Sequence, residues 1–124
     1  MTMVLRALAG IAGLLALLVA VRMWMAPVET AGQLGVLAPG QLGLATIPAD
    51  MGGFFAGGGL FALAAAIRGR AGPLIVPVVL IGLALTGRLL TVAITGFTDD
   101  MGPPMAIEAV LLLIFAAGWR MLPR

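Results

Sequence analysis

The chain alternates between four long apolar segments and short stretches that carry its glycines, prolines and charges. The apolar segments cover residues 4–26, 49–67, 73–95 and 105–122. Each has about the 20 residues that an α-helix needs to cross the hydrocarbon core of a bilayer. The pattern therefore predicts an all-α fold: a four-transmembrane-helix bundle that forms a single integral membrane domain over residues 1–124.

The first segment has a second interpretation, a secretory signal peptide, because Arg6 precedes an apolar stretch. No small-x-small cleavage site follows cleanly after Val21. We therefore predict an uncleaved helix that spans the membrane.

Residues 27–48 break the apolar pattern with three prolines and a single charged residue, Glu29. A short repeat, Gly-Gln-Leu-Gly, occurs at 32–35 and again at 40–43. We predict a loop here, and two interpretations stay open. The loop lies on the membrane interface or folds over the bundle, or it is an ordinary mobile connection.

Composition supports lipid as the solvent of this chain. Hydrophobic residues make up 62% of it and charged residues only 10%, whereas soluble domains carry roughly 25% charged residues. The net charge is +2 and the arginines form no continuous run. A nucleic-acid partner is therefore excluded, because no stripe of cations can follow a phosphate backbone.

Missing residue types narrow the chemistry further. The chain contains no Cys, His, Tyr or Ser. Disulfides, ordinary zinc sites, haem ligation by His or Cys, and serine-based triads are therefore excluded. The eight methionines raise copper(I) as a ligand, but they are spread along the whole chain and suit gap filling better. We predict no cofactor and no metal.

The arginines predict an orientation. Five of the seven fall on one side of the predicted bundle: Arg6, Arg68, Arg70, Arg120 and Arg124. Only Arg22 falls on the other side, and the seventh lies within a segment. The positive-inside rule then places both termini in the cytoplasm. We predict a multi-pass protein of a bacterial cytoplasmic (inner) membrane.

Three ionisable residues, Asp50, Arg88 and Glu108, fall within or at the edge of the segments at matching depth in the outer half of the bilayer. A lone Arg inside a membrane span costs about 2.5–3.5 kcal/mol on insertion scales. We therefore expect Arg88 to pair with Glu108, and with Asp50 as well. Thr91 and Thr95 extend a polar stripe from Arg88 along the same helix face.

The charge cluster has two interpretations. In the first, Arg88 only locks three helices together. In the second, the cluster is a site for an anionic or polar head group, or a proton-relay carboxylate, because ionisable residues inside membranes are functional hypotheses by default. The two interpretations are compatible.

The second segment carries a glycine-rich stretch at 52–59. Gly53 and Gly57 form a small-xxx-small pair, which lets helix backbones approach closely in lipid. We predict a helix crossing at these two glycines. A phosphate-binding loop is excluded, since no Lys and no preceding strand accompany the glycines.

Several of these residues resemble a known pattern. The resemblance rests on Asp50 and the stretch 52–61, on Gly87-Arg88, on Gly96 and on Glu108. Together they are similar to the domain of unknown function 4345 family of small bacterial four-helix membrane proteins, over nearly the whole chain. In that family an Arg often follows the acidic residue of the second span, whereas Met51-Gly52 stands here. The resemblance implies a fold and residues to test, but no activity.

We expect a non-enzymatic membrane protein that binds a lipid or small amphipathic ligand, or acts as an accessory subunit of a membrane complex. Its expected partners are membrane lipid and either another membrane protein or further copies of itself. The alternative is a proton-coupled carrier or membrane isomerase that uses Glu108 or Asp50 as a base, with Arg88 as electrostatic partner.

Overall fold

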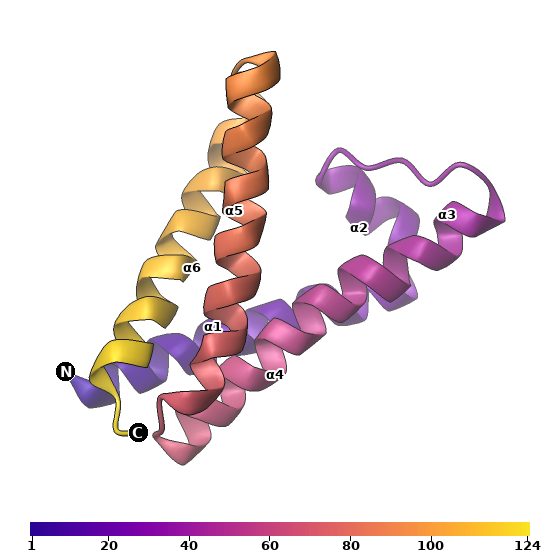
Figure 1. Ribbon diagram of the computed structural model, residues 1–124. Helices are drawn as coiled ribbons and strands as arrows, with labels where there is room; N and C mark the ends of the chain where they lie inside the picture. The colour runs from indigo at the N-terminus through magenta and orange to yellow at the C-terminus, as the bar shows by residue number, and fades with distance from the viewer.

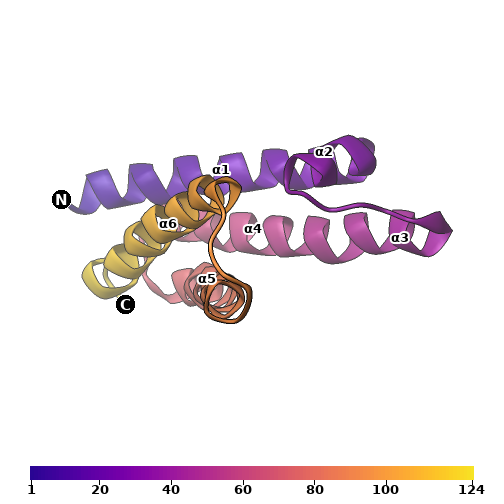
Figure 2. The ribbon, with the colours of Figure 1, turned by 90° about the horizontal axis from the view of Figure 1, so that it is seen from above.

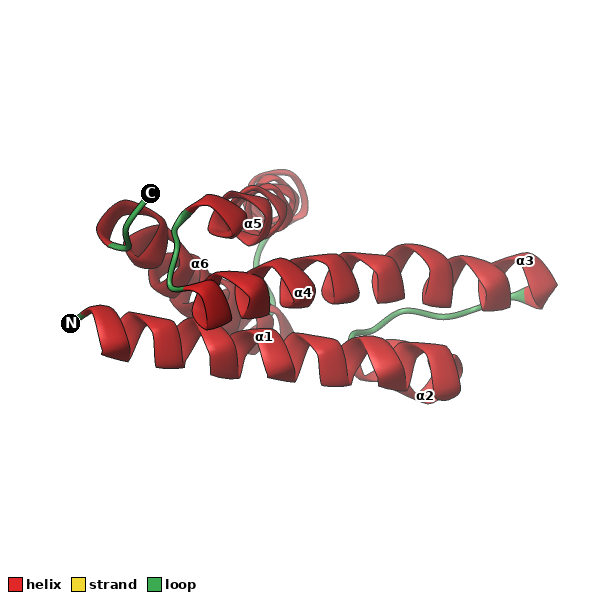
Figure 3. Ribbon diagram, turned by 90° about the horizontal axis from the view of Figure 1, so that it is seen from below, coloured by secondary structure: helices red, strands yellow, loops and turns green.

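The computed structural model describes residues 1–124 and is helical throughout, without a strand. The long helices are α1 (Thr2–Met25), α4 (Gly52–Arg68), α5 (Ile75–Thr95) and α6 (Gly102–Met121). They coincide with the four apolar segments, and with their flanking turns each is long and apolar enough to cross a membrane. The prediction of an all-helical bundle is confirmed (Figure 3).

The long helices form two antiparallel pairs. α1 and α4 lie side by side along their lengths, and α5 pairs with α6 (Figures 1 and 2). The pairs are packed together at the end that carries both chain termini, and they splay apart toward the other end (Figure 1). The joint between them is made by the α4–α5 turn, which includes the 3-10 helix η2 (Gly72–Leu74).

The joint is closely packed because its residues are mostly small. The buried cluster there consists of Ala9, Ala12, Ala62, Ala65, Ala71, Leu74, Phe115 and Leu122. A methyl group added to Gly118 would lie 2.7 Å from Leu74 Cδ1, so the Leu74 side chain packs directly on this glycine. The backbone N–H of Ala71 also donates to the carbonyl oxygen of Pro123 at 2.8 Å. The end of the chain is thereby bound to the turn that joins the pairs.

The α1–α4 crossing is made by Gly13 and Gly59. A Cβ on Gly59 would lie 2.8 Å from Gly13 O, and one on Gly13 would lie 2.9 Å from Gly59 O. The predicted crossing at Gly53 and Gly57 is wrong, since a Cβ added to either would meet nothing within 4 Å. The four-residue spacing places Gly53 and Gly57 on one face of the helix. Gly59 lies two residues beyond Gly57, almost half a turn around the helix, so the crossing uses nearly the opposite face.

Arg6 of α1 caps the C-terminus of α4. Its Nε donates to Ala66 O at 2.9 Å and its Nη2 to Ile67 O at 3.1 Å. Gly69, which directly follows the last residue of α4, ends the helix in the left-handed conformation with φ of 64°, where glycine is favoured. A cation at the C-terminal end of a helix also matches the sign of the helix dipole.

We expect Arg6→Gln to lower the free energy of unfolding by about 1–2 kcal/mol, because two charge-assisted hydrogen bonds to helix carbonyls are lost. Thermal unfolding in detergent micelles, followed by circular dichroism, measures the effect. Arg120→Gln is the matched control, since Arg120 is exposed and donates no hydrogen bond. An equal loss from both variants would contradict the capping role.

The predicted loop at 27–48 is largely helical. It contains α2 (Pro27–Gln33) and α3 (Gly40–Thr46), and α3 continues through a π-helical turn, η1 (Ile47–Met51), into α4. Proline favours the first turn of a helix, and Pro27 occupies that place in α2. The prolines that indicated a loop therefore start helical turns here. Figure 3 shows a single longer unwound stretch, between α2 and α3.

This segment packs on the far end of the α1–α4 pair. Met23, Ala31 and Ile47 are buried together there. Trp24 Nε1 donates to Pro48 O at 2.9 Å, and Gly52 leaves room for the indole ring. Of the two interpretations of the segment, the one in which it folds over the bundle agrees with this packing.

Candidate functional site

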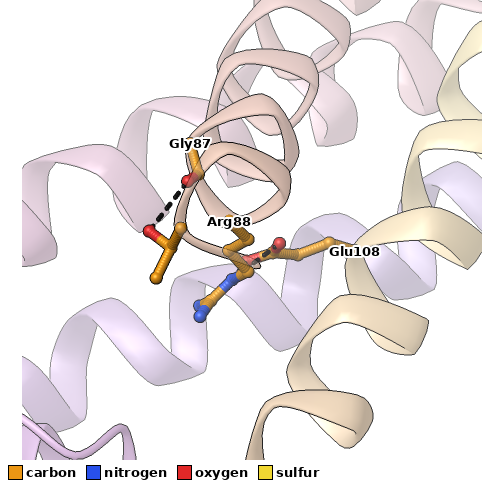
Figure 4. A network of polar contacts seen from close by, with 4 residues as sticks. Gly87, Arg88 and Glu108 are labelled. Atoms are coloured by element: carbon orange, nitrogen blue, oxygen red, sulfur yellow. Dashed lines mark hydrogen bonds and ion pairs between the residues drawn. The ribbon is translucent and has the colours of Figure 1, made fainter. Parts of the chain in front are cut away.

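Arg88 of α5 and Glu108 of α6 form the molecule's ion pair. Arg88 Nε lies 2.7 Å from Glu108 Oε1 and 2.8 Å from Oε2, so both carboxylate oxygens accept from one N–H group (Figure 4). The predicted pairing of Arg88 with Glu108 is confirmed. The pair joins α5 to α6 in the part of the hairpin that has separated from α1 and α4.

The pair uses only part of the arginine's capacity. A guanidinium carries five N–H groups, and only the one on Nε donates a hydrogen bond here. Figure 4 shows the two terminal nitrogens of Arg88 pointing away from Glu108 and from α6. The Arg88 side chain is 38% exposed and that of Glu108 is 17% exposed. Four strong donors therefore remain free on a cation that already has a partner.

A small hollow of about 80 Å³ lies beside Arg88. Arg88, Thr91, Met101 and Met105 line it, so α5 and the beginning of α6 both contribute. Thr91 Oγ1 donates to Gly87 O at 3.1 Å, which leaves its oxygen lone pairs facing outward as acceptors. The hollow thus combines donors and an acceptor with two apolar, polarizable side chains.

A second, wholly apolar hollow of about 260 Å³ lies on α6, lined by Ala106, Ile107, Val110 and Leu111. Counted along the helix, these residues lie mostly on the side of α6 opposite Glu108. This surface offers hydrocarbon contact close in sequence to the polar hollow.

Asp50 does not join the pair, which corrects the expectation that Arg88 bridges two carboxylates. Asp50 is exposed in η1 and makes no ion pair. It precedes Gly59 by nine residues, about two and a half helical turns, so it lies on the side of α4 opposite α1. The splay of the two pairs and the rotation of α4 separate Asp50 from Arg88 and Glu108.

The arrangement offers recognition chemistry more readily than bond-making chemistry. The described residues contain no group of three or more carboxylates, His or Cys side chains that would hold a metal ion. Glu108 has both oxygens bound to Arg88, and the second carboxylate proposed as a base lies elsewhere. The site presents the free N–H donors of Arg88 next to the Glu108 carboxylate, whose charge Arg88 already balances.

Comparisons of the chain with known protein families, curated proteins and solved structures found no match. The resemblance to the domain of unknown function 4345 family stays a prediction.

Proposed function

We propose that this chain is a multi-pass protein of a bacterial cytoplasmic membrane that binds the polar head of a lipid or small amphipathic ligand at Arg88. Two sets of observations support the proposal: the four long apolar helices with their arginine-rich end, and the free donors of Arg88.

The orientation rests on the arginines. The start of α1, the end of α4 and the end of α6 lie together at the joint (Figure 1), and five of the seven arginines belong to these ends or to the α4–α5 turn: Arg6, Arg68, Arg70, Arg120 and Arg124. No carboxylate accompanies them. Both termini are cytoplasmic in this proposal, because cytoplasmic loops carry the excess of Lys and Arg.

Cysteines introduced at Gly32 and Gly72 should react with a membrane-impermeant thiol reagent from opposite sides of the membrane. Both positions are exposed, and a Cβ added at either meets nothing within 4 Å. The native chain has no cysteine to interfere. Labelling in intact cells should reach Gly32→Cys only, and Gly72→Cys should react after the membrane is opened. Labelling of both variants from one side would contradict the topology.

The single observation that carries the binding proposal is the free end of Arg88. Arg88 lies seven residues before the end of α5, about 10 Å along the helix at 1.5 Å per residue. Charged donors left in hydrocarbon at such a depth are costly. A phosphate or carboxylate group accepts two parallel hydrogen bonds from the planar guanidinium, one on each of two oxygens. A lipid-like molecule is the partner that reaches this depth from the surrounding bilayer.

Native mass spectrometry of the protein extracted in mild detergent tests the proposal. The wild-type chain should retain lipid from the host membrane, and Arg88→Ala should retain about tenfold less, since a bidentate contact contributes at least that factor. Arg88→Lys, which keeps a cation for Glu108 but loses the planar guanidinium, should also retain less. Arg22→Ala is the control, because Arg22 lies in the last turn of α1, away from the joint. Equal retention by all four proteins would contradict the proposed function.

A further inference from the structure

The ion pair also indicates which class of head group the site takes. We infer that the ligand, given the proposed function, carries a phosphate with a cationic amine a few atoms away, as in a zwitterionic aminophospholipid. The argument rests on the charge balance at Arg88 and on the acceptors left on Glu108.

The charge balance disfavours a purely anionic head group. Arg88 and Glu108 together have no net charge, and Arg88 is the only ionisable residue that lines the hollow. An anion without a counter-charge would leave the site at −1 in a medium of low dielectric constant, where uncompensated charge is costly. A head group that carries one negative and one positive charge keeps the site neutral.

The free donors of Arg88 and the free lone pairs of Glu108 offer one binding position for each charge of a zwitterionic head group. The terminal nitrogens of Arg88 offer donors to the phosphate oxygens. Glu108 Oε1 and Oε2 each accept one bond from Arg88 Nε, and each carboxylate oxygen has a further lone pair. Glu108 is 17% exposed, so its carboxylate is not fully enclosed by the protein. Both binding positions belong to one guanidinium–carboxylate pair, which suits a phosphate and an amine joined by a short linker.

The surroundings favour a lipid over a soluble zwitterion of the same chemistry. Met101 and Met105 line the polar hollow together with Arg88 and give it an apolar surface. Acyl chains bury apolar area on such a surface, whereas free glycerophosphoethanolamine, which has no acyl chains, gains nothing from it.

Competition measured by native mass spectrometry on the full-length, delipidated protein tests the inference. The probes are short-chain phosphatidylethanolamine, short-chain phosphatidylglycerol and free glycerophosphoethanolamine, which keeps the phosphodiester and the amine but has no acyl chains. The wild-type protein should bind phosphatidylethanolamine about tenfold over phosphatidylglycerol and should not bind the free head group at the same concentration. Glu108→Gln, which leaves Arg88 without a counter-charge, should reverse the preference in favour of phosphatidylglycerol.

The outcomes separate this inference from the proposed function. If wild-type protein prefers phosphatidylglycerol, or if Glu108→Gln leaves the preference unchanged, the zwitterionic class is wrong while binding at Arg88 stands. If Arg88→Ala binds every probe as wild type does, the proposed function itself fails. Binding of glycerophosphoethanolamine as tight as that of the lipid would overturn the lipid source. The wild-type preference is measured without any variant, so a folding defect in Glu108→Gln leaves a decisive result.

Discussion

Replacing Gly59 with leucine should destabilise the protein by about 3 kcal/mol or more, the largest effect that we expect from a single substitution. The first atom of the new side chain would lie 2.8 Å from Gly13 O and 3.0 Å from Leu17 N. Both are backbone atoms, which cannot move aside as a flexible side chain does. α1 and α4 would have to separate along the crossing that holds the pair together. Thermal unfolding in detergent, together with the elution profile, measures the loss.

Gly57→Leu is the matched control, because it introduces the same side chain into the same helix two residues away. A Cβ at Gly57 meets nothing within 4 Å, so this variant should unfold close to the wild-type temperature. Gly13→Leu should behave like Gly59→Leu, since its Cβ would lie 2.9 Å from Gly59 O. If Gly57→Leu proved as damaging as Gly59→Leu, the described α1–α4 crossing would be wrong.

The second large effect is expected from Arg88→Ala, which should lower the free energy of unfolding by about 3 kcal/mol. The variant leaves the Glu108 carboxylate without a counter-charge between two apolar helices. Removal of one partner from a buried pair typically costs about 3–5 kcal/mol, and the partial exposure of Arg88 places the effect at the lower end. Glu108→Gln should cost less, since the amide oxygen still accepts a hydrogen bond from Arg88 Nε.

The double variant Arg88→Leu with Glu108→Leu separates a structural lock from a binding site. Stability should return toward the wild-type value, because a well-packed apolar pair often replaces an ion pair without loss. Lipid retention should stay low, since the donors are gone. Recovery of both stability and lipid retention would show that the pair only holds α5 to α6.

The features that follow from burial in lipid, namely the four long helices and the pairing of Arg88 with Glu108, were predictable from the sequence. Apolar length set the four long helices, and the cost of an unpaired Arg in lipid pointed from Arg88 to Glu108. Both inferences need only position along a helix. The helical turns of residues 27–48 were missed because prolines mark a loop and the first turn of a helix equally well.

The rotation of each helix about its own axis was not predictable. Nearly all residues of a span are apolar, so no hydrophobic face shows which side meets a neighbour. This explains why Gly53 and Gly57 were chosen over Gly59. It also explains why Asp50 was expected to pair with Arg88, although Asp50 lies on the side of α4 opposite α1. The capping of α4 by Arg6 was likewise hidden, since the positive-inside pattern already accounted for that residue.

The most direct test of binding at Arg88 is a ³¹P–¹⁵N distance measurement by solid-state NMR, on arginine-labelled protein in phospholipid bilayers. The Arg88 terminal nitrogens are identified as the signals that disappear in Arg88→Lys. The account predicts that these signals are dephased by a lipid phosphorus at hydrogen-bonding range, with N···O distances of about 2.7–2.9 Å. Absence of dephasing at Arg88, while the arginines at the joint do show contact with phosphate, would contradict it.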